Sequence, residues 1–277
     1  MKKSFVNNPA PMIAGVVRRR TIKEAIAEIK NCEIDGADVI DLHLSCMDEA
    51  YKNVESIREI VNESKKPILA LNYNQTYENE NYDTDEEERV ALLLKAAEAG
   101  VAAIDVQGYT YDLGSKRGFR SEFEYMDYSF IKGNPCEIVV DEKIIAKQCE
   151  LIEKIHSMGV EVLFSCHPFI YMNTEQIVDL AHFFERRNPD IIKLVTWCDT
   201  DEQLAEAFKT MITLKREVKT PTHFHCVGQK GTLTRIVNPM LGSQLIFCLD
   251  RFTESSNFGQ LDLKTAKLVR DNVNKLL

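Results

Sequence analysis

The chain has 277 residues, of which 44% are hydrophobic and 28% charged, so it is long enough to bury a large core. Its formal net charge of -9 argues against nucleic acid as a partner, because phosphate binding requires a basic face. No apolar stretch reaches the roughly 18 residues that a membrane span needs, and the first residues lack the apolar core of a signal peptide. We therefore expect a cytoplasmic protein that does not interact with membranes.

Segments typical of strands and helices alternate along almost the whole chain. Apolar runs rich in β-branched residues predict strands at 12–17, 39–44, 67–72, 102–106, 160–167, 190–197, 221–226 and 244–249. Helical periodicity predicts helices at 21–34, 49–64, 84–99, 141–158, 174–187, 200–218, near Leu233, and at 261–277. Thr21 and Glu24 have the spacing of a capping box at the start of the first helix.

This alternation predicts an α/β fold, a (β/α)8 TIM barrel, with residues 1–277 forming a single domain. An open doubly wound sheet is less well supported, because no GxGxxG motif follows the first predicted strand. One segment, at about 108–135, is too long for an ordinary loop and is rich in aromatic residues. It follows a strand, so it would lie on the catalytic face of a barrel as a lid or pocket wall, or else form a subunit interface.

The cysteines predict neither a metal site nor a disulfide framework. There are eight, and none forms a CxxC pair, so a zinc site is not expected. Their scatter along the chain, often in or beside predicted strands, is typical of buried thiols in a reducing compartment.

Lys193 and His167 are the main candidates for catalysis. Each lies in or at the end of an apolar run that predicts a buried strand. Burial disfavours the ammonium form of a lysine and so makes its amine available as a nucleophile. His167, one strand–helix unit earlier, could carry protons for it. The alternative is structural: Lys193 extends its ammonium group past the strand end, and His167 is a core histidine with satisfied hydrogen bonds.

Two further segments could bind an anion beside this pair. After the seventh predicted strand, Gly228 and Gly231 precede Arg235, which can hold a carboxylate with two hydrogen bonds. After the eighth, Ser256 and Gln260 could add hydrogen bonds. Together these residues suit a ketone that carries a carboxylate. A lysine imine of such a ketone acidifies the neighbouring C–H bond, which leads to dehydration or to aldol cleavage.

These residues resemble the type I 3-dehydroquinate dehydratases, the Schiff-base dehydratases of the shikimate and quinate pathways. The resemblance runs from about Gly36 to Gln260. It implies that Lys193 forms the imine, that His167 is the general acid/base, and that Arg235 binds the carboxylate. Further residues match the family pattern, namely Gly228, Gly231, Thr234 in place of a serine, Gly242, Ser243, Ser256, Gly259 and Gln260.

The N-terminal half departs from the family pattern. The family's Glu-x-Arg-x-Asp on strand two is replaced by a run containing Asp41 and His43, and strand three ends at Asn72 without the family's arginine and Glu-Gly-Gly. We expect Asp41, His43 and Asn72, with Asn74 and Glu78 as further candidates, to replace the groups that bind substrate hydroxyls. A site built to bind a hydroxyl discriminates by factors of about 10⁴ or more, so these changes should alter substrate preference or slow the original reaction.

The sequence thus predicts a lyase that removes water from 3-dehydroquinate or a related carboxylated ketone, with no metal and no organic cofactor. The pathway would be aromatic amino acid biosynthesis or quinate catabolism, and the resemblance implies a homodimer. Two alternatives stay open. One is a Schiff-base aldolase or isomerase acting on a related carboxylated ketone. The other is a catalytically silent barrel that binds a shikimate-like metabolite.

Overall fold

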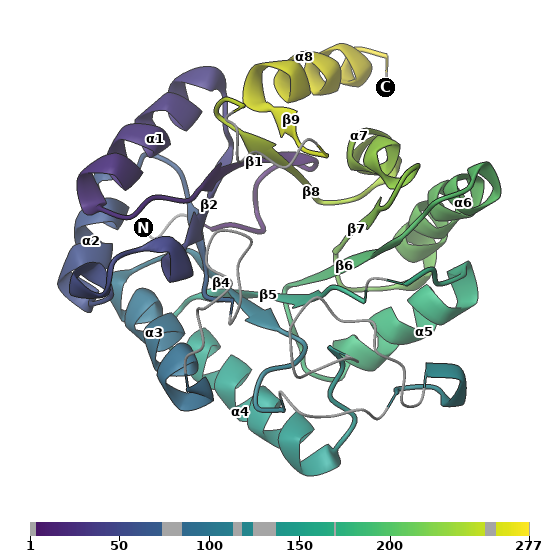
Figure 1. Ribbon diagram of the computed structural model, residues 1–277, viewed down its shortest axis with the longest axis horizontal. Coiled ribbons are helices and arrows are strands. Elements are labelled where there is room, and N and C mark those ends of the chain that lie inside the picture. Colours follow the sequence, from purple (N-terminus) through teal and green to yellow (C-terminus); the bar gives the residue numbers. More distant parts are fainter. Residues whose placement is uncertain are drawn as a thin grey trace. The chain divides into compact units, whose positions relative to one another are not determined.

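The computed structural model describes residues 4–73, 85–112, 118–123, 137–168, 170–252 and 259–276. Strands and helices alternate along it, which confirms the α/β class (Figure 1). The strands are β1 (Met12–Val17), β2 (Val39–His43), β3 (Ile68–Leu71), β4 (Ala103–Gln107), β5 (Glu161–Cys166), β6 (Ile191–Trp197), β7 (Thr222–Val227), β8 (Leu245–Leu249) and β9 (Leu261–Asp262). The two-residue strand β9 is absent from the sequence prediction, which has a helix begin at 261.

The helices lie close to their predicted positions. They are α1 (Ile22–Asp35), α2 (Val54–Glu63), α3 (Glu86–Ala99), α4 (Glu142–Ser157), α5 (Thr174–Glu185), α6 (Asp201–Glu217), α7 (Thr234–Leu241) and α8 (Leu263–Asn274). Short 3-10 helices are η1 (Leu44–Cys46), η2 (Glu49–Tyr51), η3 (Ser121–Phe123) and η4 (Gly231–Leu233). No helix among the described residues is both long enough and apolar enough to cross a membrane.

The strands form a sheet in the order β7-β6-β5-β4-β3-β2-β1-β8-β9. The ladders β1–β2, β1–β8, β2–β3, β3–β4, β5–β6, β6–β7 and β8–β9 are all parallel. A parallel sheet joined by helices brings the carboxyl ends of its strands to one edge, where enzymes of this class build their sites.

Contacts divide the chain into two compact units. The first comprises Met1–Asp105, Met158–Glu161 and Leu245–Leu277, and the second comprises Val106–Ser157 and Val162–Gln244. The prediction of a single domain over 1–277 stays a prediction.

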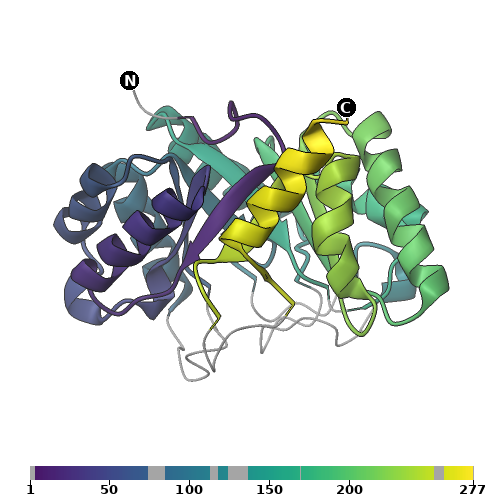
Figure 2. The same cartoon turned by 90° about the horizontal axis from the view of Figure 1, so that it is seen from above.

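In the first unit, β1 lies between β2 and β8, and α8 packs against both β1 and β8. Figure 2 shows α8 (yellow) beside β1 (purple). Helix α1 begins with the predicted capping box, since the Thr21 and Glu24 side chains each bind the other's backbone N–H. It packs closely on β1: a Cβ on Gly15 would lie 2.8 Å from Cys32 Sγ.

In the second unit, β5, β6 and β7 are followed in turn by α5, α6 and α7. Ser165 in β5 is in register with Lys193 in β6, which is in register with His223 in β7. Arg187, only 1% exposed, donates from Nε to Gln148 Oε1 at 2.7 Å and from Nη2 to Val139 O at 2.8 Å. This buried guanidinium therefore links the end of α5 to the segment that precedes α4.

Candidate active site

Lys193 lies inside β6 and is only 7% exposed. The strand forms because its neighbours are mostly β-branched and buried, among them Ile191, Ile192 and Val195. Side chains alternate between the two faces of a strand, so Lys193 and Val195 share one face, while Ile192 and Leu194 face the other way. The sequence prediction of a buried lysine within a strand is confirmed.

His167 directly follows β5 and is also 7% exposed. Its register places it two residues beyond Ser165, the partner of Lys193. The backbone N–H of His167 donates to Glu137 Oε2, and its Nδ1 lies 3.3 Å from Glu137 Oε1. Burial is the main cause that lowers the pKa of His167 well below its usual value of 6.5, and electrostatic interactions with Lys193, His223 and Arg235 act in the same direction. The ring is therefore neutral near pH 7 and can accept a proton.

Two histidines on β7 extend this cluster and were missed from the sequence. His223 and His225 stand two positions apart, so they share a strand face with Lys193. His223 Nε2 lies 2.8 Å from His225 Nδ1, and Ser243 Oγ lies 2.9 Å from His223 Nδ1. Burial, with the charge of Arg235 next in importance, also lowers the pKa of His225 well below 6.5. The His-x-His pattern in a predicted strand was the signal available.

Arg235 is half-buried at the start of α7. The buried hydroxyl of Thr234 fixes this helix end: it accepts from Cys226 N–H at 2.8 Å and donates to Gly231 O at 2.5 Å. Gly231 is required here, because a Cβ would meet the Cys226 carbonyl carbon at 2.7 Å. The charge of Arg235 acts on both His167 and His225, so the second unit brings Lys193, His167 and Arg235 together.

In the first unit, Asp41 and His43 form a buried pair. His43 Nε2 lies 3.2 Å from Asp41 Oδ2, and the two residues are 6% and 3% exposed respectively. The ring of Tyr73 meets that of His43 edge to face, with centroids 6.3 Å apart, and its hydroxyl donates to Asp105 Oδ2 at 3.2 Å. Asp41 Oδ1 is buried and has no hydrogen-bond partner among the described residues. This orphaned acceptor is suited to a hydroxyl donor from outside the chain.

The remaining predicted binding residues have different surroundings. Asn72 is fully buried, and its amide donates to Arg89 O at 3.1 Å, while Arg89 Nη1 donates to Asn72 O at 2.9 Å. Gln260, in the first unit, is 8% exposed, and its Oε1 has no partner within the described ranges. Ser256, Asn74 and Glu78 lie outside the described residues, so their predicted roles stay predictions.

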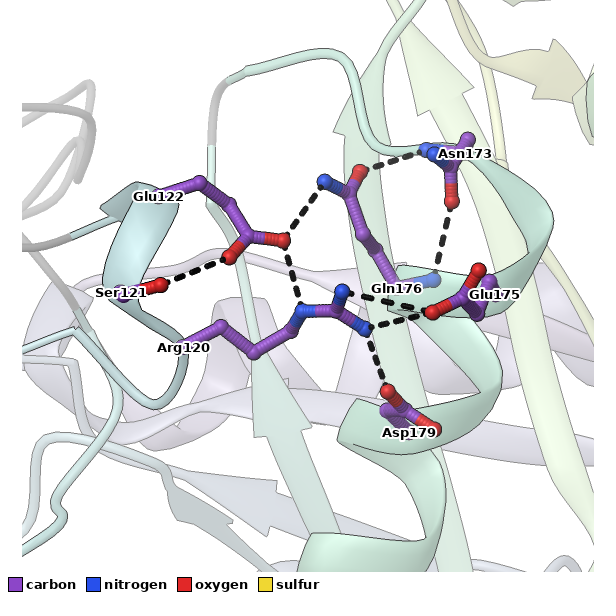
Figure 3. A network of polar contacts seen from close by, with 7 residues as sticks. All are labelled: Arg120, Ser121, Glu122, Asn173, Glu175, Gln176 and Asp179. Carbon is purple, nitrogen blue, oxygen red and sulfur yellow. Dashed lines mark hydrogen bonds and ion pairs between the residues drawn. The ribbon is translucent and has the colours of Figure 1, made fainter.

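Residues 108–112 and 118–123 of the predicted insert at about 108–135 are described, and Arg120 joins the insert to α5 through ion pairs. Arg120 pairs with Glu122 at 2.7 Å, with Glu175 at 3.3 Å and with Asp179, as Figure 3 shows. Phe119 stacks on Phe123 with ring centroids 5.4 Å apart. The predictions of a lid and of a subunit interface for this segment both stay predictions.

Metal sites in proteins are built from acidic, histidine and cysteine side chains. Among the residues that the structure describes, no group of three or more of them could hold a metal ion. The predicted site residues carry amine, imidazole, guanidinium and carboxylate groups.

Comparison with known proteins identifies relatives over most of the chain. The family model described as type I 3-dehydroquinase matches residues 13–274. A 3-dehydroquinate dehydratase from Desulfotalea psychrophila is 24% identical over 83% of this chain and 84% of its own length. One from Coxiella burnetii is 23% identical over 92% and 90%. The chain spans 34% of a bifunctional 3-dehydroquinate dehydratase/shikimate dehydrogenase from Arabidopsis thaliana, at 26% identity.

Solved structures give the same result for the fold. The type I 3-dehydroquinate dehydratase of Clostridium difficile, solved with covalently modified comenic acid, superimposes with a TM-score of 0.74, 17% identity, and coverage of 98% of this chain and 95% of that one. The enzyme of Geobacillus kaustophilus gives a TM-score of 0.72 at 15% identity, with coverage of 96% and 91%. The fold class is thus the predicted (β/α)8 TIM barrel, and the chain belongs to the type I 3-dehydroquinase family.

Proposed function

We propose that this protein is a carbon–oxygen lyase that dehydrates 3-dehydroquinate, a step of the shikimate pathway. One observation carries the proposal: in a member of the type I 3-dehydroquinase family, the buried Lys193 shares a compact unit with a neutral His167 and with Arg235. This set combines a nucleophile, a proton carrier and an anion-binding group.

The chemistry starts at the Lys193 amine. The amine attacks the ketone carbon and, after loss of water, forms an iminium ion that withdraws electrons from the neighbouring carbon. Neutral His167 removes a proton from that carbon, and the electron pair gives an enamine. The enamine expels the hydroxyl group one carbon further on, and the imidazolium of His167 returns the proton to it as water. Hydrolysis of the conjugated imine releases the product and restores Lys193.

Arg235 would hold the substrate carboxylate with two charge-assisted hydrogen bonds. Gln260 and Ser256, by resemblance to the family, would add neutral hydrogen bonds to the same group. The buried, unpartnered Oε1 of Gln260 supports its part in this, since a buried acceptor favours a donor from a ligand.

Asp41 and His43 would replace the family's hydroxyl-binding residues on strand two. Asp41 Oδ1 offers the acceptor and the His43 ring a further polar contact. Asn72 remains a candidate for the same role, although its amide N–H is engaged with Arg89 O. Because the family's arginine and Glu-Gly-Gly are replaced, we expect slower turnover of 3-dehydroquinate than of a ketone whose hydroxyls suit this altered set.

The proposal also covers the cofactor requirement, the cellular location, the oligomeric state and the pathway. The type I family acts through a Schiff base on a lysine, so neither a metal nor an organic cofactor is required. We also propose a cytoplasmic location and a homodimer. A role in quinate catabolism is an alternative to one in aromatic amino acid biosynthesis, because the same dehydration serves both.

Trapping of the imine tests this proposal. The protein is incubated with 3-dehydroquinate and borohydride, and the adduct is located by peptide mass spectrometry. We expect an adduct on Lys193, with dehydrated product in the untrapped reaction. Lys193→Met should abolish both, whereas Lys230→Met should keep both, because Lys230 is a half-exposed lysine paired with Asp201.

The outcomes separate the alternatives. An adduct that yields cleavage or isomerisation products would instead indicate an aldolase or isomerase. A thermal shift with 3-dehydroquinate but no adduct and no turnover would indicate a catalytically silent binding protein. The absence of any adduct with carboxylated ketones would refute Schiff-base chemistry.

A further inference from the structure

We propose that Glu137 is the positioning residue of His167, holding its ring in the Nδ1–H tautomer so that Nε2 is the proton acceptor. The catalytic consequence of this inference rests on the proposed function, whereas the tautomer itself does not. Glu137 lies just after the aromatic insert, in a part of the chain for which the sequence predicts no functional role.

The contacts of Glu137 assign the tautomer. Its carboxylate is fully buried and accepts the His167 backbone N–H at Oε2, while Oε1 lies 3.3 Å from His167 Nδ1. A carboxylate can only accept in such a pair, so Nδ1 carries the hydrogen and Nε2 is left with its lone pair. The two contacts to one residue fix both the position of the backbone and the rotation of the ring.

The segment around Glu137 is held firmly in place. Ile138 and Val139 are fully buried, and Val139 O accepts from the buried Arg187 at 2.8 Å. The Cys166 thiol donates to Glu137 O, with Sγ 3.4 Å from the oxygen. Glu137 itself has a φ of 47°, in the left-handed region that residues with a Cβ seldom adopt. Glycine would fit this backbone more easily, so Glu137 holds a conformation that the surrounding contacts must stabilise.

The electrostatic surroundings give the carboxylate a second effect. Lys193 from β6, His223 from β7 and Arg235 from α7 all act on His167 in the direction that lowers its pKa. The carboxylate of Glu137 acts in the opposite direction and favours the imidazolium that forms after proton abstraction. Without it, His167 would be a weaker base in a cationic site, and its ring would be free to exchange tautomers.

The tautomer can be measured without any substrate. In protein labelled with ¹⁵N-histidine, the two ring nitrogens of His167, assigned with the His167→Gln variant, report which one is protonated. We expect Nδ1 protonated and Nε2 bare in the wild type near pH 7. In Glu137→Gln the tautomers should mix, and the pKa of His167 should fall further. Glu122→Gln is the matched control, a partly exposed glutamate paired with Arg120, and should change neither.

Kinetics then test the catalytic consequence. We expect Glu137→Gln to lower kcat on 3-dehydroquinate by about 10²-fold while KM changes little, because loss of tautomer control affects proton transfer rather than binding. The acidic limb of the kcat/KM profile should move to lower pH with the pKa of His167. A merely structural role would lower activity together with folded protein and leave that limb in place.

The two proposals fail in different ways. A wild-type His167 with bare Nδ1, or a Glu137→Gln variant with unchanged tautomer and titration, overturns the positioning role. The wild-type measurement alone decides this point if the variant does not fold. A wild type with the expected tautomer but no turnover and no adduct refutes the dehydratase proposal and leaves the positioning role standing.

Discussion

Acidification should destabilise this protein through two buried histidines, His167 and His225. Burial is the main cause that lowers the pKa of both well below 6.5 in the folded state, with nearby cationic groups adding to it. In the unfolded chain each imidazole titrates near its usual value of about 6.5. Below that pH the unfolded state binds more protons than the folded state, so the free energy of unfolding falls as the pH falls.

The magnitude follows from linkage. For a histidine that stays neutral in the folded state, the free energy of unfolding falls by about 1 kcal/mol per pH unit once the pH is below the pKa of the unfolded state. Between about pH 7.5 and pH 5.5, each of the two should therefore remove about 1 to 2 kcal/mol. Their sum is a large share of the about 5–15 kcal/mol by which a typical domain is stable.

Urea unfolding measured in steps over this pH range tests the expectation. His225→Gln should reduce the loss of unfolding free energy between the two pH limits by about 1 to 2 kcal/mol relative to the parent. His182→Gln is the control, since His182 has a 46% exposed side chain on α5 and is paired with Glu185, and it should change the loss much less than His225→Gln does. An equal pH dependence in His225→Gln and the parent would refute a neutral, buried His225.

Two substitutions test the binding of the substrate carboxylate by Arg235 and the packing of the first unit. Arg235→Lys should raise KM for a carboxylated ketone by about tenfold with a smaller effect on kcat, because lysine cannot make the paired hydrogen bonds. Arg251→Lys is the control, since Arg251 is exposed. An unchanged KM in steady-state kinetics would show that Arg235 does not bind the substrate. Gly15→Ala would place its Cβ 2.9 Å from Cys32 Cβ and should lower the free energy of unfolding by about 1–3 kcal/mol. Thermal denaturation measures this loss, and an unchanged Tm would contradict the close packing of α1 on β1.

The sequence predicted the strands and helices well because their signals are local. Lys193 could be singled out because a lysine amid β-branched residues is an anomaly within a single strand. Thr21 and Glu24 predicted the capping box from their spacing alone, and the structure confirms it. Asn173 and Gln176 form a second capping box that the sequence analysis missed, although the same spacing rule applies.

The parts of the site that could not be predicted depend on contacts between distant residues. Glu137 meets His167 across 30 positions, after a segment without periodicity, so neither pattern nor spacing links the two. The engagement of the Asn72 amide with Arg89 is likewise a tertiary contact. A sequence identifies which residues are chemically able, but their partners depend on how elements pack.

The hydrogen-bonded series Ser243–His223–His225 has a consequence for how the site could adapt to a ligand. If the Ser243 hydroxyl donates to His223 Nδ1, then His223 Nε2–H donates to His225 Nδ1 and His225 Nε2 carries a hydrogen that it can donate. If His225 Nδ1–H donates to His223 instead, His225 Nε2 is an acceptor. Both directions have the same net charge. Reversal therefore converts His225 from donor to acceptor with no net change in charge, because the proton that leaves His225 Nε2 is balanced by one that enters at the Ser243 end. A ligand group at His225 Nε2 could thus be bound either as an acceptor or as a donor.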